Sequence, residues 1–275
     1  MMIKNTNIDY DIKINDIKLE LYQNSKNDKS SLLIIINKPE SLNAISSSIL
    51  KELLNILDYY KDREFVRSIV ITGSGKKAFI AGADIKSMSN YSPQEAYEYS
   101  CIGQKLVENI TSYNKPIVAA VNGYALGGGC EIASACHIRY ASENASFGQP
   151  EVKLGLLAGF GGTQRLPKVV SKGKAMEMLL TGNMYTAEEA HSFGLVDDIF
   201  ESKDLMSKVK DICNLIVKNG PNSISKTIEL VNKSYDLDQI DGFSIEAIEF
   251  GKLFDEKESK EGMGAFIEKR KPNFD

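Results

Sequence analysis

Two glutamates and a run of three glycines, all within residues 122–151, are the groups in this sequence best suited to chemistry. The segment reads NGYALGGGCEIASACHIRYASENASFGQPE, in which Gly127–Gly129 precede Glu131 and in which Glu151 is the last residue. Glycine lets a backbone N–H approach a ligand closely, and a helix that starts at such a turn directs its free N–H groups at that ligand. Carboxylates beside these donors can transfer protons. We therefore predict a site where negative charge develops on a substrate oxygen beside a proton transfer.

The chemistry that fits this pattern is the formation of an enolate next to a carbonyl group. Removal of one backbone donor to a developing oxyanion costs about 3 kcal/mol, so such donors are a large part of catalysis. A single glutamate is more often solvated or a helix cap, but Glu131 lies in an apolar run between Cys130 and Ile132. A strand and a turn predicted between the two glutamates leave open whether they converge. A dinucleotide-binding G-x-G-x-x-G motif is excluded because Ile132 occupies its last position.

The elements that must position these residues follow from the hydrophobic pattern. Short apolar runs predict strands, and apolar residues at helical spacing predict helices between them. The alternation favours an α/β fold with a parallel or mostly parallel sheet. Up to residue 122, strands are expected at 17–22, 32–36, 66–72 and 117–121. Ser46 is expected to cap a helix that runs to about Tyr60, and a second helix is expected at 93–113. We interpret 1–15 as a loose arm or an extra edge segment and 24–30 as a turn.

After Glu151 the pattern changes to a glycine-rich segment and then to helices. A strand at 196–200 interrupts them, and a strand at 137–140 is expected before Glu151. Apolar and aromatic residues of the last two helices are expected to be exposed in a single chain, which favours burial against another subunit. The helices are predicted at 174–180, 187–193, 205–217, 223–231, 243–254 and 262–269.

Composition excludes several classes of protein. The net charge of −4 over 275 residues lacks the strongly basic balance of a nucleic-acid-binding protein. No apolar run reaches the length of a membrane span, and the first residues lack the apolar region of a signal peptide. The four cysteines lack C-x-x-C spacing, so we expect buried, reduced thiols and no metal site. We therefore expect a cytoplasmic protein that binds neither nucleic acid nor a membrane.

Several segments together resemble the enoyl-CoA hydratase (crotonase) family. The resemblance runs from about Leu32 to the end of the chain and implies a crotonase-type α/β fold, a superhelix of ββα turns. It further implies a core with the CoA-ester site over 1–200 and a helical region over 201–275 that builds homo-trimers, commonly paired as hexamers. The matching segments are AGADIK (81–86), KPIVAAVNGYALGGGCE (115–131), FGQPE (147–151), GGTQRLP (161–167) and EGMGAFIEKRKP (261–272).

The resemblance also implies roles for individual residues. The N–H groups of Ala83 and Gly128 would form the oxyanion hole for the thioester oxygen. Glu131 would activate a water for attack on C3, and Glu151 would supply the proton to C2, giving syn addition to a 2-trans-enoyl-CoA. Coenzyme A would enter as part of the substrate, with no other cofactor. The residues implied in binding the CoA ester are Leu42, Ala44, Ala81, Ala83, Asp84, Ile85 and Lys86.

Both glutamates are present, which is similar to the hydratase branch of the family. A related isomerase, a dehydratase acting in reverse and a non-catalytic CoA- or RNA-binding member remain alternatives. Phe160 departs from the family pattern, in which a small residue is more usual at this place. A ring there would shorten the acyl pocket and favour a short-chain substrate such as crotonyl-CoA.

Overall fold

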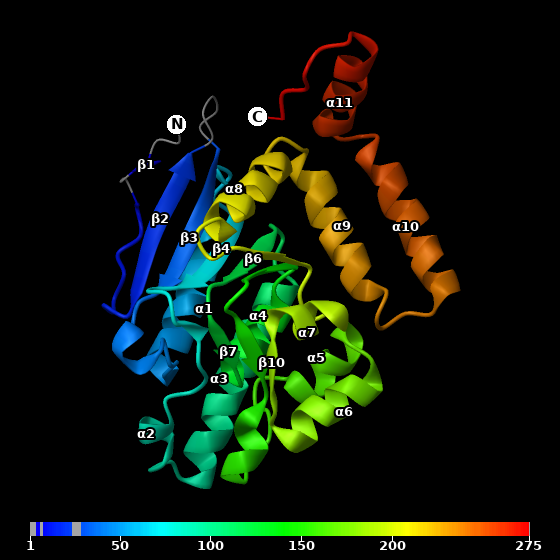
Figure 1. Ribbon diagram of the computed structural model, residues 1–275. Helices are drawn as coiled ribbons and strands as arrows, with labels where there is room; N and C mark the ends of the chain where they lie inside the picture. Colours follow the sequence, from blue (N-terminus) through cyan, green and yellow to red (C-terminus); the bar gives the residue numbers. More distant parts are fainter. Residues whose placement is uncertain (1–3, 6–7, 24–28, 275) are drawn as a thin grey trace.

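A computed structural model describes residues 4–5, 8–23 and 29–274, and within them two β-sheets lie among helices (Figure 1). The larger sheet has seven strands in the order β1-β2-β3-β4-β6-β8-β11. From β3 to β11 every neighbouring pair is parallel, as predicted, whereas β1, β2 and β3 pair antiparallel. The strands are β1 (Lys4–Asn5), β2 (Ile17–Gln23), β3 (Ser30–Ile36), β4 (Val66–Gly73), β6 (Ile117–Val121), β8 (Ile138–Ser142) and β11 (Asp198–Phe200).

The N-terminal segment is docked on the molecule. Of the two predicted alternatives, an extra edge segment is the one observed, because β1 pairs with β2 at the edge of the sheet. Beyond it, the Tyr10 hydroxyl and the Lys13 N–H both donate to Oε1 of Glu52, at 3.2 and 3.0 Å. Glu52 is only 3% exposed, so these bonds satisfy a buried carboxylate. Of the turn predicted at 24–30, residues 24–28 lie outside the described part of the chain.

Alternate residues of the larger sheet contact different layers, as strand geometry requires. Leu33, Val70 and Val118 pack against α8 (Leu205–Ile216) on one face. Their neighbours in sequence point to the opposite face, where they join the main core. Helix α8 belongs to the region predicted to drive assembly, yet it is part of the folded core; the division of the chain at residue 200 stays a prediction.

The second sheet is small and has the order β10-β9-β7-β5. Its strands β5, β7 and β9 are parallel to one another, and β10 runs antiparallel to β9. Two of its side chains, Phe79 and Phe147, are fully buried, so the sheet is anchored in the core. The strands are β5 (Ala78–Ile80), β7 (Tyr124–Leu126), β9 (Ser146–Gly148) and β10 (Met184–Thr186).

Helices α1 (Ser47–Lys61) and α3 (Pro93–Thr111) each begin directly after a serine that caps the helix N-terminus. Ser46 accepts the Ile49 N–H at 3.4 Å, and Ser92 forms a capping box with Glu95. The other elements of the core are η1 (Pro39–Ser41), α2 (Ile85–Met88), α4 (Gly128–Ala135), η2 (Pro150–Leu154), α5 (Gly162–Val169), α6 (Lys172–Thr181) and α7 (Ala187–Ser192).

The last three helices are α9 (Pro221–Lys233), α10 (Gln239–Leu253) and α11 (Lys257–Ile267). Figure 1 shows α9 and α10 as a pair that projects away from both sheets. Phe250 on α10 and Phe266 on α11 are 64% and 84% exposed, so the predicted exposure of these aromatic residues is correct. Within the described residues, no helix is both long and apolar enough to cross a bilayer.

The cysteines are free thiols among the described residues. Cys130, Cys136 and Cys213 are buried as predicted, but Cys101 is only half-buried because its position on α3 faces partly outward. His137, predicted to be structural, accepts the Ile117 N–H at Nδ1 at 2.8 Å. Burial lowers the pKa of His137, which keeps the imidazole neutral and suited to that bond.

Candidate active site

Three parallel strands of the small sheet end at one edge and bring three of the predicted site residues together. Ala83 follows β5, Gly128 follows β7 and Glu151 follows β9, each within three residues of the strand's end. The carboxyl ends of parallel strands meet at the same edge, and ligands commonly bind there. Strand order therefore explains how residues far apart in the sequence become neighbours.

The N–H of Ala83 is left free by the way its loop is bonded. Ala83 forms an isolated parallel bridge with Ile45, in which Ile45 donates to Gly82 O and Asp84 donates to Ile45 O, both at 2.9 Å. In such a bridge the N–H of the central residue points to the other side. No group in the described part of the chain accepts the Ala83 N–H.

Gly128 offers a second free donor because it is the first residue of α4. The first N–H groups of a helix have no partner within it and lie at the positive end of its dipole. Gly127, the preceding residue, has φ 51°, a left-handed conformation that favours glycine. A methyl group at Gly128 would lie 3.2 Å from Cδ1 of Ile45. Ile45 thus adjoins both predicted oxyanion-hole donors, Ala83 and Gly128.

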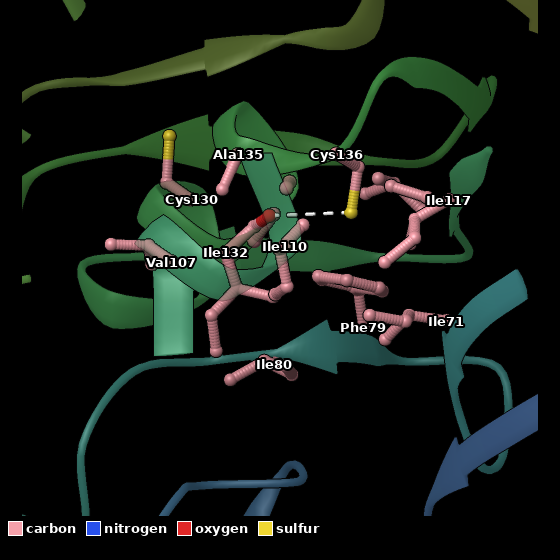
Figure 2. Close-up of a cluster of buried hydrophobic side chains, with 14 of the residues drawn as sticks. Ile71, Phe79, Ile80, Val107, Ile110, Ile117, Cys130, Ile132, Ala135 and Cys136 are labelled. Carbon is pink, nitrogen blue, oxygen red and sulfur yellow. Dashed lines mark hydrogen bonds between the residues drawn. The ribbon is translucent and has the colours of Figure 1, made fainter. Parts of the chain in front are cut away.

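Helix α4 is fixed by burial on all sides. Figure 2 shows Ile132 of α4 among the core side chains Ile80, Val107 and Ile110. The Sγ of Cys136 donates to the carbonyl of Ile132 at 3.4 Å and closes the end of the helix. A side chain at Gly129 would overlap the Ile80 carbonyl, so the start of α4 is packed directly on β5. This packing gives the Gly128 N–H and the Glu131 side chain defined positions.

Glu131 is a buried side chain in which one carboxylate oxygen is fixed by hydrogen bonds. It is 2% exposed, and its Oε1 accepts the N–H groups of Phe160 at 2.8 Å and Gly162 at 2.7 Å. Among the described residues, no donor reaches Oε2, which leaves that oxygen available to a water or substrate. Burial raises the pKa of Glu131 to about 7; the two N–H bonds oppose the shift and the charge of Glu151 adds to it. A base with this pKa is matched to work near neutral pH.

Glu151 lies on the other side of the glycine turn. A methyl group on Gly127 would come within 2.6 Å of its Oε1, so the carboxylate lies directly over that glycine. The side-chain amide of Gln149, with its nitrogen oriented toward the carboxylate, lies 3.1 Å from both oxygens of Glu151. Burial also raises the pKa of Glu151. Glu131 thus lies in the first turn of α4 and Glu151 lies over the residue just before that helix, and burial biases each toward the protonated form.

An apolar cavity of about 410 Å³ opens beside Glu151. Most of its lining comes from the segment after Glu151 and from α6, and only the Glu151 carboxylate and the Thr163 and Lys172 side chains bring polar groups to it. Such a cavity suits the hydrocarbon part of a ligand whose polar end lies at the carboxylates. Its apolar lining residues are Val152, Leu157, Ala158, Pro167, Ala175, Met176, Leu179 and Leu180.

The residues predicted to bind the CoA ester lie on the loop after η1 and on the segment that leads from β5 into α2, and the two segments are hydrogen-bonded to each other. Leu42 O accepts the Ala81 N–H at 3.1 Å, and Lys38 forms an ion pair with Asp84 at 3.2 Å. Leu42, Ile85 and Lys86 are exposed, and Ala44, Ala81, Ala83 and Asp84 are half-buried. These residues therefore form one accessible surface next to the Ala83 N–H.

The ring of Phe160 is wedged beside the same donors. It packs edge-to-face on Tyr99 with centroids 5.2 Å apart, and a methyl group at Gly128 would lie 2.8 Å from its Cε2. On its far side it lies over Gly103 of α3, where any side chain would overlap it. The ring is buried, so it occupies space that a smaller residue would leave open next to Gly128.

Sequence reasoning did not find the partners of the two glutamates. The glycine-rich segment after residue 154 is tightly turned, with Gly161 at φ 97°, and it supplies the two N–H groups bound to Glu131. Gln149, two residues before Glu151, was given no role in the sequence analysis. Asn43 gave no signal, because a buried asparagine in a loop looks like any turn residue in sequence.

Comparison with known proteins places the chain among related sequences. The family model described as enoyl-CoA hydratase/isomerase matches residues 26–275. A relative named crotonyl-CoA hydratase, from Syntrophomonas wolfei, is 43% identical over 255 residues, which cover 92% of this chain and 98% of the relative. The short-chain-enoyl-CoA hydratase of Clostridium acetobutylicum is 41% identical, over 87% of this chain and 92% of its own length. A crystal structure of an enoyl-CoA hydratase from Bacillus anthracis superposes with a TM-score of 0.89 at 32% identity, covering 94% of this chain and 99% of that one.

Proposed function

The chain belongs to the enoyl-CoA hydratase/isomerase family, and on that premise we propose that it adds water reversibly to short-chain 2-trans-enoyl-CoA thioesters, giving 3-hydroxyacyl-CoA. It is an enzyme of the hydro-lyase class. The observation that carries this proposal is the placement of two carboxylates beside two free N–H groups. One of the carboxylates, Glu131, has a pKa of about 7.

The thioester oxygen binds between the N–H groups of Ala83 and Gly128. As water attacks C3, electrons move toward that oxygen and an enolate develops. Donors fixed in advance, in a site shielded from solvent, stabilise this charge without reorganising. The positive end of the α4 dipole acts in the same direction at Gly128. These contacts strengthen as charge develops, so they lower the barrier more than they tighten substrate binding.

Proton transfer is divided between the two carboxylates. Ionised Glu131 takes a proton from the water through its free Oε2 while the water oxygen bonds to C3. Protonated Glu151 delivers its proton to C2, and both groups arrive on one face of the double bond, which gives syn addition. The product gains one water in total; Glu131 leaves the step protonated and Glu151 ionised, and proton exchange restores the pair. Burial raises the pKa of both groups, which suits carboxylates that exchange protons near neutral pH. The assignment of the base to Glu131 rests on its free Oε2.

A preference for short acyl chains is supported by two observations. The relatives named above act, by name, on crotonyl-CoA and on short-chain enoyl-CoA. The Phe160 ring fills space beside Gly128 that a longer chain would need. CoA itself binds along the loop that carries Leu42 and the start of α2, which carries Lys86.

The chain assembles as a homo-trimer or a pair of trimers through its C-terminal helices. The exposure of Phe243, Phe250 and Phe266 supports this, because exposed aromatic side chains that lie near one another are unfavourable in water and mark interaction surfaces. Sedimentation velocity measures the assembly directly. The cytoplasmic location stays a prediction. The reaction as written needs no metal or electron carrier, so we expect dialysis against EDTA to leave the rate of hydration unchanged.

Hydration of crotonyl-CoA, followed by the loss of enoyl-thioester absorbance, tests the function. Glu131→Gln and Glu151→Gln each lower kcat by about 10²- to 10⁴-fold, the usual contribution of a positioned acid or base. Glu177→Gln, which changes an exposed glutamate paired with Lys174, serves as the control. Calorimetry with 3-hydroxybutyryl-CoA shows retained binding in both site variants. Unchanged turnover in either one overturns the two-carboxylate mechanism, and consumption of a 3-enoyl-CoA in place of the 2-enoyl-CoA assigns the chain to the isomerases.

A further inference from the structure

Asn43 is a buried side chain that uses all of its hydrogen-bonding capacity to hold one loop. Its Oδ1 accepts the Lys38 N–H at 3.0 Å and the Ser74 hydroxyl at 3.4 Å. Its Nδ2 donates to the carbonyls of Ala78 at 2.8 Å and Ser74 at 3.0 Å. Asn43 is 0% exposed, and a methyl group at Gly73 would lie 2.6 Å from its Nδ2, so the amide fits a space that only glycine leaves open.

The backbone of this loop has a conformation that the chain does not adopt unaided. Leu42 and Asn43 have φ 54° and 59°, two consecutive non-glycine residues in the left-handed region. Asparagine tolerates this conformation better than most residues, whereas leucine rarely adopts it. A conformation of this kind persists only where surrounding bonds enforce it, and strain of this kind gathers at functional sites. Here the N–H groups of Leu42 and Asn43 donate to Pro39 O and Lys38 O within the loop, and the four bonds of the Asn43 amide tie the loop to its surroundings.

The loop is bonded directly to the segment that carries the proposed oxyanion donor. Leu42, just before Asn43, accepts the Ala81 N–H at 3.1 Å. Ile45, two residues after Asn43, forms the parallel bridge with Ala83. Ala83 is thus bonded through its neighbours to residues on both sides of Asn43, and its N–H direction follows the loop conformation. Donors must lie about 2.7–3.1 Å from the developing oxyanion to stabilise it fully.

We propose that Asn43 is a positioning residue: through the loop at Leu42–Ile45 it aims the Ala83 N–H at the thioester oxygen. The inference rests on the proposed function, and it extends that function to a side chain that touches neither substrate nor carboxylate. Its chemical consequence is specific, because a loosened loop weakens one hydrogen bond to the carbonyl oxygen and leaves the glutamates in place.

The variant Asn43→Gly tests this, since glycine keeps the left-handed backbone accessible while removing every side-chain bond. We expect kcat for crotonyl-CoA hydration to fall about 10- to 100-fold, less than the loss of a whole oxyanion donor, with KM little changed. The infrared C=O stretch of bound 3-hydroxybutyryl-CoA, labelled with ¹³C at the thioester carbon, moves toward its value in free solution. Asn37→Ala is the matched control, because Asn37 precedes the loop and, among the described residues, its side chain donates to Asn15 O at 3.4 Å and to no group of the loop.

Each outcome is decisive. A rise in KM with kcat and carbonyl frequency unchanged overturns the proposal, because the loop would then serve CoA binding only. Lower thermal stability with wild-type kcat per folded molecule also overturns it. If Asn43→Gly does not fold, Ser74→Ala takes its place, because it removes only the 3.4 Å bond to Oδ1 of Asn43. We expect a smaller fall in kcat and a smaller shift of the C=O stretch, in the same directions. If neither kcat nor the C=O stretch changes, the proposal is wrong. A wild-type protein without hydratase activity refutes the proposed function instead.

Discussion

The Oε1 of Glu131 accepts the N–H of Phe160 at 2.8 Å, while the ring of the same phenylalanine packs beside Gly128. One residue therefore anchors the proposed base through its backbone and limits the adjacent space through its side chain. The two effects are separable by mutation, because a change of side chain leaves the N–H in place.

Phe160→Ala is expected to shift the substrate preference toward longer acyl chains. Loss of the ring opens space beside Gly128, and each additional buried methylene group then contributes about 0.8 kcal/mol to binding. We expect kcat/KM to rise for enoyl-CoA esters of six carbons or more and to fall or stay constant for crotonyl-CoA. A series of esters from four to sixteen carbons measures the change.

Phe193→Ala is the matched control for that series. Phe193 also makes an edge-to-face contact, with Tyr185 at 5.5 Å, but it has no contact with Gly128. An unchanged chain-length profile in Phe160→Ala would show that the acyl chain extends instead into the 410 Å³ cavity beside Glu151. Substitution of Leu179 by a larger residue would then be the informative experiment.

The pH dependence of hydration is expected to have its ascending limb near the pKa of Glu131, about 7. The base must be ionised to accept a proton, so kcat/KM rises with pH until Glu131 has lost its proton. Glu151 raises this pKa by its negative charge, so Glu151→Gln lowers it. The ¹³C chemical shift of the Glu131 carboxyl carbon, titrated in both proteins, reports the change even where activity is lost. An unmoved titration midpoint would mean that the two carboxylates do not interact.

Glu131→Gln is expected to stabilise the protein at alkaline pH. The pKa of Glu131 is raised from 4.5 to about 7, so the folded state disfavours the ionised form. Stability is therefore unaffected below pH 4.5, falls as pH rises from 4.5 to 7, and stays lower above 7. A shift of this size corresponds to about 3 kcal/mol at most.

The amide removes this ionisation and keeps an oxygen for the N–H groups of Phe160 and Gly162. Thermal unfolding at pH 8 and at pH 4.5 provides the comparison, with a higher Tm for the variant only at pH 8. Equal Tm differences at both values would show that ionisation of Glu131 does not cost stability.

Gly162→Ala is expected to displace the base. A methyl group there would lie 2.9 Å from Oε1 of Glu131 and 2.9 Å from Cβ of Ala158, so the carboxylate must move. Displacement of a reacting group by about 1 Å costs on the order of 10²-fold in rate. Gly173→Ala is the control, because Gly173 is also helical and nothing lies within 4 Å of the added methyl group. Equal rates for both variants would argue against a fixed position for Glu131.

Much of the fold was predictable from the sequence. The crotonase-type α/β fold is confirmed by the family match and by the solved structures. The strand predicted at 117–121 has those bounds. The helix predicted to be capped by Ser46 and to run to about Tyr60 is observed as Ser47–Lys61, with Ser46 as its N-cap. These elements are long or fully buried, so their hydrophobic pattern is unambiguous.

The small sheet was not predicted, because β5, β7 and β9 have three residues each and three residues show no period. The hydrogen-bond partners of the site residues could not be predicted from local sequence either. The N–H groups that bind Glu131 and the four bonds of Asn43 join segments distant in sequence, and no local pattern specifies which backbone group a buried side chain will meet. The residue types at Glu131 and Glu151 were readable; their surroundings depend on tertiary structure.

The edge where β5, β7 and β9 end also has a consequence for how this protein can diverge. Each strand is followed by one of the groups of the proposed mechanism: the N–H of Ala83, the N–H of Gly128 and the carboxylate of Glu151. If the proposed roles hold, a single codon change at residue 151 alters the proton donor and leaves both N–H groups for the thioester oxygen in place. New reactions on the same activated carbonyl can therefore arise one substitution at a time, and each protein along that route still binds the thioester.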